Sequence, residues 1–425
     1  MSTFLWYEIK NFGSFGSKGG VVDLTTSTKD KSEDLWRENS GHRINLLTAV
    51  MGANASGKTT LIKVIPYISF LLWRIPEKRT DKLILLNNKF SNELTYISVC
   101  FLLDGKEYLY KITLCQFMIF EEELFVKNSR NQNVYLFKRC IEKDSAFKIF
   151  NYYNNFDAAR EIEEENMLRS VKYSYSFKEQ YFKFNAEYAS RVATNCLILS
   201  EARRLNDALA SNIANSFLCS SNVNYAGRIA PGYNDLNEVV TQLARNPIHF
   251  KKVKDIIMKW DLGLKDIKLT EVQWVGENGD VQVKYNIYGV HTNSDGIEID
   301  LPFVSESAGT INALIRLNDI MCCIANGSPC IVDELGDDLH PHMIKPILEL
   351  FIDPEINKLN SQLLFTCHRP ELINYLGKYR VIICEKRENV SECYRLDEFS
   401  SEDERDSDNL AAKYLSGAFG GVPEL

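Results

Sequence analysis

The first third of the chain is patterned in short runs that predict β-strands. The runs 4–12 (FLWYEIKNF), 19–25 (GGVVDLT) and 44–52 (INLLTAVMG) are rich in β-branched and aromatic residues, and Gly, Ser and charged residues separate them. The segment 59–75 (TTLIKVIPYISFLLWRI) has instead the apolar density and length of a buried helix. A strand, a turn and a helix are therefore expected in succession around residue 52.

The next stretch predicts an antiparallel layer of strands. Apolar and β-branched residues fill 93–105 and 106–115, which meet at an Asp-Gly pair, a combination typical of tight hairpin turns. The runs 121–127 and 133–139 have the same character. We expect these four runs to form neighbouring strands of one sheet.

The pattern changes near residue 151, where helix formers with helical spacing begin and continue to about residue 264. Strand-like runs return at 267–275, 281–290 and 296–304. The sequence shows no internal repeat and no long array of heptads. The expected parts are an N-terminal half of the domain at 1–150, a helical insertion at 151–264 and a C-terminal half at 265–425.

Composition indicates a folded protein without a membrane role. The chain has 425 residues, and its 45% hydrophobic content is normal for a buried core. The longest apolar stretch, 64–75, is shorter than the roughly 20 residues that a membrane-spanning helix needs. The N-terminus lacks the basic start and cleavage site of a secretory signal, so a cytoplasmic location is expected.

The charge and the cysteine content further narrow the classes of protein to which this chain could belong. The net charge of −8 argues against a protein that coats nucleic acid over its whole surface, although a local basic patch is compatible with it. The eleven cysteines lack paired C-x-x-C spacing and the spacing of metal ligands, so they predict reduced, mostly buried thiols.

The segment MGANASGKTT, residues 51–60, matches the phosphate-loop pattern G-x-x-x-x-G-K-[ST]. A Gly-rich turn can be only a turn, but here an apolar strand precedes it and an apolar helix follows. Its backbone N–H groups would cradle the α and β phosphates of ATP, Lys58 would reach the β and γ phosphates, and Thr59 would help to hold Mg²⁺. The residues expected to bind the nucleotide here are Gly52, Ala53, Asn54, Ala55, Ser56, Gly57, Lys58, Thr59 and Thr60.

A second motif, PCIVDELGDDLHP at 329–341, places two carboxylates directly after an apolar run. Taken alone, Asp333-Glu334 would more often be an ordinary surface turn. With a phosphate loop upstream, a buried strand is expected to deliver Asp333 to Mg²⁺ and Glu334 to the attacking water as general base.

A third motif, VSESAGTINALIRLNDI at 304–320, predicts a small-residue loop that opens an amphipathic helix. Ser307, Gly309 and Thr310 would form a second anion-binding site at the start of that helix. Within one chain the phosphate already has a cradle, so this site predicts a head-to-tail homodimer in which each subunit closes over the ATP of the other.

Together with SQLLFTCHRPELI at 361–373, these motifs in this order resemble the ABC-type ATPase heads of the SMC and OLD group. A lone histidine is usually structural, but by this resemblance His368 would be the γ-phosphate sensor and a catalytic residue together with Glu334 and Lys58. The implied fold is an α/β ABC-type P-loop ATPase head, with a mixed central sheet, an antiparallel β layer and an inserted helical subdomain.

The segments SESAGT, VDELGDDLHP, IICEKR and YLSGAFGGVPEL resemble more narrowly the stand-alone ATPase family that includes RloA and the AriA subunit of the PARIS phage-defence system. This chain departs from that family at Gly13, where relatives have a basic residue. No convincing glutamine loop is found, although Asn87, Asn88 and Asn92 lie in the expected region.

The resemblance implies a slow ATPase that acts as a switch or scaffold in anti-phage defence. Dimers or higher homo-oligomers would form around ATP and control a separate effector, such as a nuclease, in response to nucleic acid or a phage-derived trigger. The insertion has no heptads for long-range DNA tethering, and the segment after His368 is too short for the nuclease domain of OLD proteins.

Two other functions stay open on the sequence alone. One is a DNA-maintenance ATPase similar to RecF or SMC proteins, for which Lys251, Lys252 and Lys254 are the candidate basic residues, although a solvated helix face explains them better. The other is a general ATP-dependent regulator outside defence.

Overall fold

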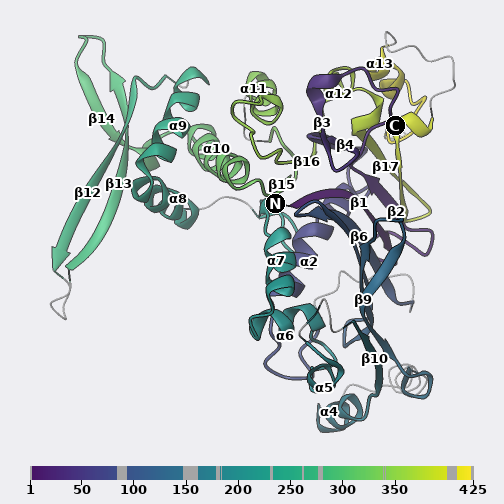
Figure 1. The fold of residues 1–425 in the computed structure, drawn as a ribbon. Helices are drawn as coiled ribbons and strands as arrows, with labels where there is room; N and C mark the ends of the chain where they lie inside the picture. Colours follow the sequence, from purple (N-terminus) through teal and green to yellow (C-terminus); the bar gives the residue numbers. More distant parts are fainter. Residues whose placement is uncertain are drawn as a thin grey trace.

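The computed structural model describes residues 2–83, 93–146, 161–178, 182, 184–229, 233–260, 263–275, 281–337, 339, 341–399 and 409–422. It has a central sheet between two groups of helices, a second sheet packed across one of these groups, and an arm that projects to one side (Figure 1).

The central sheet is mixed, as expected. Its strand order is β11-β15-β16-β5-β17-β18, in which the first five strands are parallel and β18 is antiparallel to β17. The strands are β5 (Leu47–Met51), β11 (Ser220–Ser221), β15 (Cys330–Val332), β16 (Leu363–Thr366), β17 (Val381–Arg387) and β18 (Val390–Arg395). Because parallel strands end at one edge, the segments that follow β5, β15 and β16 meet there.

The central strands β5, β15 and β16 are buried at every position because both faces of the sheet are covered. In β5, Leu47, Ala49 and Met51 contribute to one core and Val50 to the other. The alternation of side chains along a strand thus divides one short run between two cores.

The antiparallel layer is also confirmed. Seven strands follow one another in the order β10-β9-β8-β7-β6-β1-β2, and every pair in this sheet is antiparallel. They are β1 (Ser2–Lys10), β2 (Gly20–Asp23), β6 (Thr95–Leu103), β7 (Lys106–Leu114), β8 (Ile119–Lys127), β9 (Asn133–Ile141) and β10 (Tyr173–Phe177). The hairpin turn between β6 and β7 has positive φ at Asp104 (50°) and Gly105 (75°), as an Asp-Gly turn requires.

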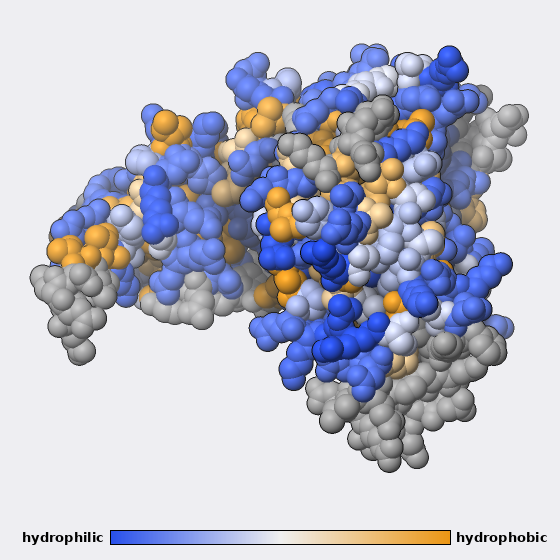
Figure 2. Space-filling model, turned by 60° about the horizontal axis from the view of Figure 1, so that its bottom comes forward, coloured by the Kyte–Doolittle hydropathy of each residue, from blue (hydrophilic) through white to orange (hydrophobic). Residues whose placement is uncertain are grey.

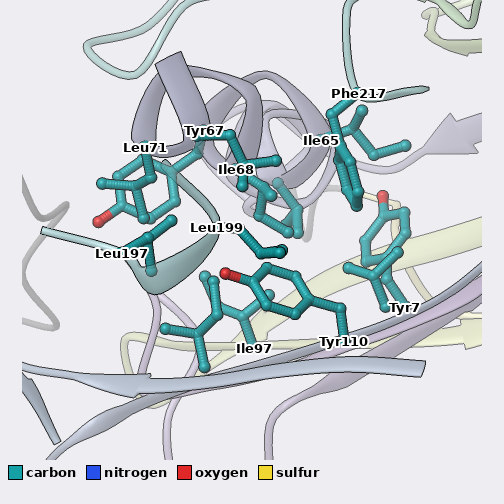
Figure 3. Packing of buried hydrophobic residues seen from close by; sticks show 14 of the residues in the cluster. Tyr7, Ile65, Tyr67, Ile68, Leu71, Ile97, Tyr110, Leu197, Leu199 and Phe217 are labelled. Atoms are coloured by element: carbon teal, nitrogen blue, oxygen red, sulfur yellow. The ribbon is translucent and has the colours of Figure 1, made fainter. Parts of the chain in front are cut away.

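The first core lies where the antiparallel sheet meets four helices. Two of them, α1 (Lys58–Ile62) and α2 (Val64–Trp73), come directly after the phosphate loop, and the other two are α6 (Ile198–Arg204) and α7 (Ala208–Ser216). Ile97 and Tyr110 from the sheet face Ile68 of α2 and the neighbouring Leu199, and Tyr7 lies near Ile65 and Phe217 (Figure 3). The Tyr7 hydroxyl also donates to the Leu61 carbonyl at 2.9 Å, which ties the sheet directly to α1.

The second core covers the opposite face of the central sheet. Its helices are α8 (Tyr233–Arg245), α9 (Pro247–Ile257), α10 (Ala308–Asn326), α11 (Pro341–Ile352), α12 (Glu371–Leu376) and α13 (Leu410–Leu415). By length and composition alone, α10 is the one described helix that could cross a membrane. More than half of its apolar window is buried, and its buried residues pack in the second core, as expected for a core helix.

The arm is a three-stranded antiparallel sheet, β12 (Asp266–Val275), β13 (Val281–Thr292) and β14 (Glu298–Pro302), that leads into α10. It projects away from the rest of the molecule beside α8 and α9 (Figure 1). Apolar side chains are visible among hydrophilic ones near its far end (Figure 2). Exposed apolar residues of the arm strands include Val272, Val281, Val283 and Ile299.

The segment expected to be a helical insertion contains α4 (Glu161–Arg169), α5 (Ala186–Ala189) and α6 to α9. Its helices are divided between the two cores, because α6 and α7 pack in the first and α8 and α9 in the second. It also holds β10, whose alternating sequence YSYSF was concealed by the helix formers around it and pairs with β9. The domain boundaries themselves stay a prediction.

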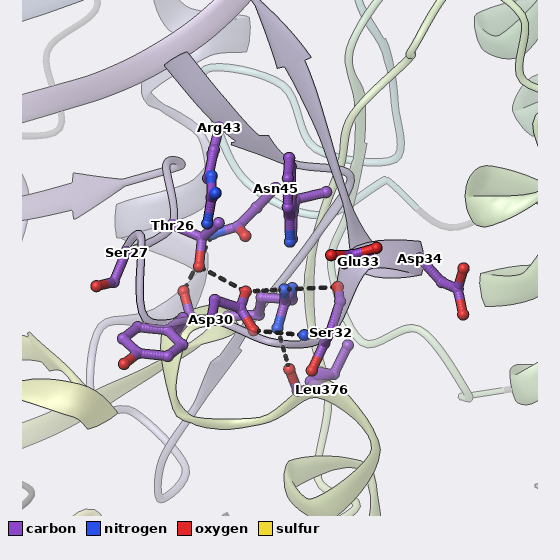
Figure 4. A network of polar contacts seen from close by, with 12 residues as sticks. Thr26, Ser27, Asp30, Ser32, Glu33, Asp34, Arg43, Asn45 and Leu376 are labelled. Carbon is purple, nitrogen blue, oxygen red and sulfur yellow. Dashed lines mark hydrogen bonds and ion pairs between the residues drawn. The ribbon is translucent and has the colours of Figure 1, made fainter. Parts of the chain in front are cut away.

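A buried ion pair ties the N-terminal half to the C-terminal half. Arg380, just before β17, contacts Asp30, and both side chains are almost completely buried (Figure 4). Asp30 also accepts from the Thr26 hydroxyl (2.7 Å) and the Ser32 N–H (3.0 Å), and Arg380 donates to the Leu376 carbonyl (2.9 Å). The charges are thus compensated by hydrogen bonds, as burial requires.

The remaining elements are short. A two-stranded ribbon pairs β3 (Trp36–Asn39) with β4 (His42–Asn45). Single 3₁₀ turns lie at Glu33–Leu35, Met258–Trp260, Phe303–Ser305, Lys378–Arg380 and Leu396–Glu398. All eleven cysteines, each in the described part of the chain, are free thiols, and six of them are buried.

Candidate functional site

The phosphate loop leaves the end of β5 and enters α1, as predicted. It turns at Gly52 (φ 148°) and Gly57 (φ 110°), backbone conformations that residues with a side chain rarely adopt. A Cβ at Gly52 would lie 2.0 Å from the Cys384 carbonyl oxygen, and one at Gly57 would lie 2.5 Å from the Ser391 hydroxyl. The two glycines of the motif are therefore required by packing as well as by backbone geometry.

Lys58 lies folded over this loop. Its ammonium donates to the carbonyls of Gly52 (3.0 Å) and Ala53 (2.8 Å), and the residue is 6% exposed. Burial lowers the pKa of Lys58, and the nearby charge of Asp333 acts in the opposite direction. The ammonium is thus placed at the mouth of the loop, where a phosphate oxygen could replace its carbonyl partners.

A hydrogen-bonded chain of oxygens joins the phosphate loop to the carboxylate motif. The Thr59 hydroxyl donates to one carboxylate oxygen of Asp333 at 2.8 Å, and the Thr366 hydroxyl donates to the other at 2.6 Å. Asp333 is 2% exposed and directly follows β15. Hydroxyl and carboxylate oxygens are the ligands that Mg²⁺ prefers, so Thr59 and Asp333 fit the predicted metal site.

Two hydrogen bonds from a residue next to the outermost strand, β11, hold the backbone of Asp333. The buried Asn222, which follows β11, accepts from the Asp333 N–H at 2.7 Å and donates to its carbonyl at 2.8 Å. One side-chain amide therefore satisfies both backbone groups of Asp333, in the way a neighbouring strand would.

Glu334 stands at the exposed side of this arrangement. Its backbone has a positive φ of 53°, which is uncommon for glutamate, and its N–H donates to the Thr366 hydroxyl at 2.7 Å. One carboxylate oxygen contacts Arg228, and the other lies 3.9 Å from the His368 ring nitrogen Nε2. Arg228 also donates to Asp337 at 2.8 Å.

His368 follows β16 by two residues and reaches the same edge of the sheet. Burial, and after it the positive charge of Lys58, lowers the pKa of His368, so the ring is neutral near pH 7. A neutral ring can either donate or accept a hydrogen bond at the nitrogen that faces Glu334.

Two hollows flank the turn that carries His368. One, of about 410 Å³, lies between the loop residues 51–54, the turn 367–370 and the C-terminal residues 414, 415, 421 and 422. The other, of about 280 Å³, lies between 334–337 and the same turn. Solvent and ligand can therefore approach Glu334 and His368 from this edge of the sheet.

The N-terminal turn packs against the phosphate loop from another side. Gly13 has a φ of 59°, and a Cβ there would lie 2.5 Å from the Thr60 side chain. The neighbouring Ser14 hydroxyl is hydrogen-bonded to the Ser391 hydroxyl at 2.7 Å, next to Gly57. The glycine that departs from the family pattern thus allows close contact between this turn and α1.

The third motif lies apart from the other two. Ser307 caps the start of α10, where its hydroxyl accepts from the Thr310 N–H at 3.1 Å, and both Ser307 and Ala308 are exposed. Among the described residues, no hydrogen bond or ion pair links 307–310 to the phosphate loop 52–60 of the same subunit. The structure brings together the phosphate loop, Asp333, Glu334 and His368, and it does not bring Ser307, Gly309 and Thr310 to them.

A protein-family model matches residues 47–374, most of the chain, under the description "AAA domain, putative AbiEii toxin, Type IV TA system". The chain belongs to this AAA family. The match begins with β5, includes the phosphate loop, Asp333, Glu334 and His368, and ends in α12. It assigns this protein to the AAA-type ATPases, and no curated protein matches the sequence significantly.

Solved structures similar to this AAA protein include SMC heads. They include the SMC head domain from Thermotoga maritima (12% identity, 92% of this chain and 98% of the other covered, TM-score 0.40). Another is the Smc head domain with an extended coiled coil bound to the C-terminal domain of ScpA, derived from Pyrococcus furiosus (12% identity, 98% and 100% covered, TM-score 0.42).

Four residues of this AAA site were not predicted from the sequence. Thr366 could have been found, because it is the polar residue that ends an apolar strand two positions before His368. Asn222 and Arg228 lie in a segment without a motif, and Asp337 lies in a motif whose partner is distant in sequence. The positions considered for a glutamine loop, Asn87, Asn88 and Asn92, lie outside the described residues.

Proposed function

We propose that this protein binds ATP with Mg²⁺, hydrolyses it slowly, and acts as a switch in a prokaryotic anti-phage defence system. The observation that carries the enzymatic part is the bond from Thr59 to Asp333, which joins the two nucleotide motifs, with Glu334 next to them at the open edge. A surface turn would not align a phosphate loop, a buried carboxylate and an exposed one in this way.

The roles of the residues follow from their positions. The backbone N–H groups of the loop and Lys58 would hold the phosphates, and Thr59 and Asp333 would hold the Mg²⁺ ion. Bound Mg²⁺ would neutralise charge on the β and γ phosphates. Glu334 accepts the proton of the attacking water, and His368 hydrogen-bonds near the γ-phosphate.

The exposed start of α10 supports a homodimer around ATP. Ser307, Gly309 and Thr310 offer a helix N-terminus and a hydroxyl that fit a phosphate, yet they have no contact with the loop of their own subunit. In a head-to-tail dimer, each of these sites covers the ATP of the partner subunit. Higher homo-oligomers would be built from such dimers.

Two likenesses support the defence context. The motifs resemble the family that includes RloA and AriA, and the family description names a toxin of a type IV TA system. Closure of the dimer would control a separate cytoplasmic effector, such as a nuclease, after a nucleic-acid or phage-derived trigger.

Two substitutions test the enzymatic part. Lys58→Ala should abolish binding of a fluorescent ATP analogue, whereas Glu334→Gln should bind it and lose turnover by about 10²-fold or more. Lys345→Ala and Glu349→Gln are matched controls, because these residues form an exposed ion pair on α11. Nucleotide affinity retained in Lys58→Ala, or turnover retained in Glu334→Gln, would refute the assignment.

DNA maintenance is the alternative function. The effect of duplex DNA on ATP turnover distinguishes it from a defence switch. Lys254 is already paired with Asp266 at 2.5 Å, so the basic residues of α9 form a weaker patch than the sequence suggests. ATP turnover that rises on addition of duplex DNA alone would favour the DNA-binding alternative. Turnover that is unchanged by DNA but altered by a co-expressed effector would favour the switch.

A further inference from the structure

The contact of Arg228 with Glu334 has no place in the chemistry above. The guanidinium nitrogen Nη1 contacts a carboxylate oxygen of Glu334 and lies 2.8 Å from one of Asp337. A carboxylate that acts as general base must present a free lone pair to water. In this conformation, Arg228 engages a lone pair of one carboxylate oxygen and holds the carboxylate in one orientation.

A compact loop, residues 222–229, places Arg228 there. At its ends, the Ile229 N–H donates to the Asn222 carbonyl at 2.7 Å, and Val223 forms a β-bridge with Arg228. At its tip, the Asn224 side chain accepts from the Ala226 N–H at 2.7 Å. These bonds close the loop on itself and hold the backbone from which the Arg228 side chain extends.

The same loop contacts the Asp-Glu motif and α2, a helix downstream of the phosphate loop. Asn222 clamps the backbone of Asp333, and the ring of Tyr225 packs on Phe70 of α2 with 4.3 Å between ring centres. A shift of α2 or of Asp333 on nucleotide binding would therefore be transmitted to Arg228.

We propose that Arg228 is a restraining residue that holds Glu334 inactive in the isolated subunit and must release it before ATP is hydrolysed. This inference rests on the proposed function, since it assigns Glu334 as the base. Arg228 acts through the position of Glu334 and does not itself take part in the reaction. It would account for a slow basal turnover that rises only when the closed dimer or a partner displaces the loop.

The exposure of the pair fits a contact that opens. The side chains of Arg228 and Glu334 are 28% and 31% exposed, and that of Asp337 is 51% exposed. Ion pairs this accessible to water are weak, so that competing interactions can separate them. By contrast, the pair of Arg380 and Asp30 is fully buried, as a permanent structural contact would be.

The test is the steady-state kinetics of Arg228→Gln in the full-length protein. Loss of the restraint should raise kcat by about 2- to 10-fold while the KM for ATP stays unchanged, because the phosphate-binding residues are untouched. Arg228→Lys keeps a positive charge and should give an intermediate kcat. Arg191→Gln is the matched control, since Arg191 forms an exposed ion pair with Glu187 on the short helix α5.

A second measurement does not depend on turnover. Hydrogen exchange of the backbone at 334–337, measured without nucleotide, should be faster in Arg228→Gln than in the wild type and unchanged in Arg191→Gln. Equal exchange in all three proteins would mean that Arg228 does not restrain this segment and would overturn the inference.

The kinetic outcomes separate the two proposals. If the wild type hydrolyses ATP, Glu334→Gln does not, and Arg228→Gln has an equal or lower kcat, the restraint is refuted and the proposed function stands. If neither the wild type nor Arg228→Gln hydrolyses ATP although both bind it, the proposed function fails and the inference fails with it.

Discussion

Thr366 shows how much of this site depends on a single hydroxyl. The residue is completely buried, donates to Asp333 and accepts from the backbone N–H of Glu334. It therefore holds the orientation of Asp333, the proposed metal ligand, and the uncommon backbone conformation of Glu334, the proposed base. Such a residue positions the reacting groups without touching them.

Thr366→Val should lower kcat about 10-fold with a smaller change in the affinity for ATP. Valine has nearly the same shape but leaves one oxygen of Asp333 and the N–H of Glu334 unpaired, each at a cost of about 1–3 kcal/mol. Steady-state kinetics and a thermal melt measure both effects. In the control Thr241→Val, the lost hydroxyl bonds only to the preceding turn of α8, at Asn237. An unchanged kcat in Thr366→Val would remove Thr366 from the site.

Among the elements, the contact between α8 and α10 buries a carboxyl group close to other acidic side chains, which is electrostatically unfavourable. Burial raises the pKa of Asp319 on α10 to about 6, the charge of Arg316 opposes this rise, and Asp235 and Glu238 on α8 add to it. These residues surround a small cavity of about 190 Å³, which Asn222 also lines. The carboxyl groups of α8 and α10 thus lie around the same cavity as Asn222 of the loop 222–229.

The raised pKa of Asp319 predicts that the stability of the folded protein depends on pH. Because the pKa of Asp319 is raised in the folded state, the folded protein binds more protons than the unfolded chain between about pH 4 and pH 6, and the contribution of Asp319 to stability falls as the pH rises through this range. Asp319→Asn should therefore raise the melting temperature at pH 7.5 and have little effect at pH 4.5. The exposed pair of α11 provides the control Glu349→Gln. A melting temperature lowered equally at both pH values would contradict the prediction.

At the level of elements, most of the fold could be predicted from local patterns. The strands of the antiparallel sheet, the hairpin at Asp104 and the turn–helix at the phosphate loop are set by alternation, turn chemistry and apolar density, which are local properties. The strand β10 was missed because five alternating residues lie among helix formers. The two-residue strand β11 was missed because it is held only by its pairing with β15.

For the whole molecule, the separation of Ser307 from the phosphate loop is the decisive feature. The helix α10 runs from the arm to the central sheet (Figure 1), so its N-terminus is directed away from the site that its C-terminal end supports through β15. Under the proposed function, a subunit built in this way would need a second copy to complete the phosphate cradle. Assembly and hydrolysis would thereby be coupled.

Ser307→Arg should spare ATP binding but block closure of the dimer. The larger charged side chain would occupy the start of α10, where the phosphate of the partner subunit is expected. Light scattering on a sizing column should show that Glu334→Gln shifts from monomer to dimer with ATP and Mg²⁺, whereas the double variant Ser307→Arg/Glu334→Gln does not. Unchanged hydrolysis in Ser307→Arg alone would refute the composite site.

The sequence by itself determined the local chemistry of this protein. Its motifs are each contiguous in the chain, and the chemistry of their residue types indicates what each could bind. They are the phosphate loop, the Asp-Glu pair, the histidine and the serine-capped helix. The tertiary structure decided what surrounds them: the hydroxyl of Thr366, the clamp of Asn222 and the contact of Arg228 with Glu334. These contacts join residues far apart in the chain, and only the pairing of β11, β15 and β16 at one sheet edge brings them together.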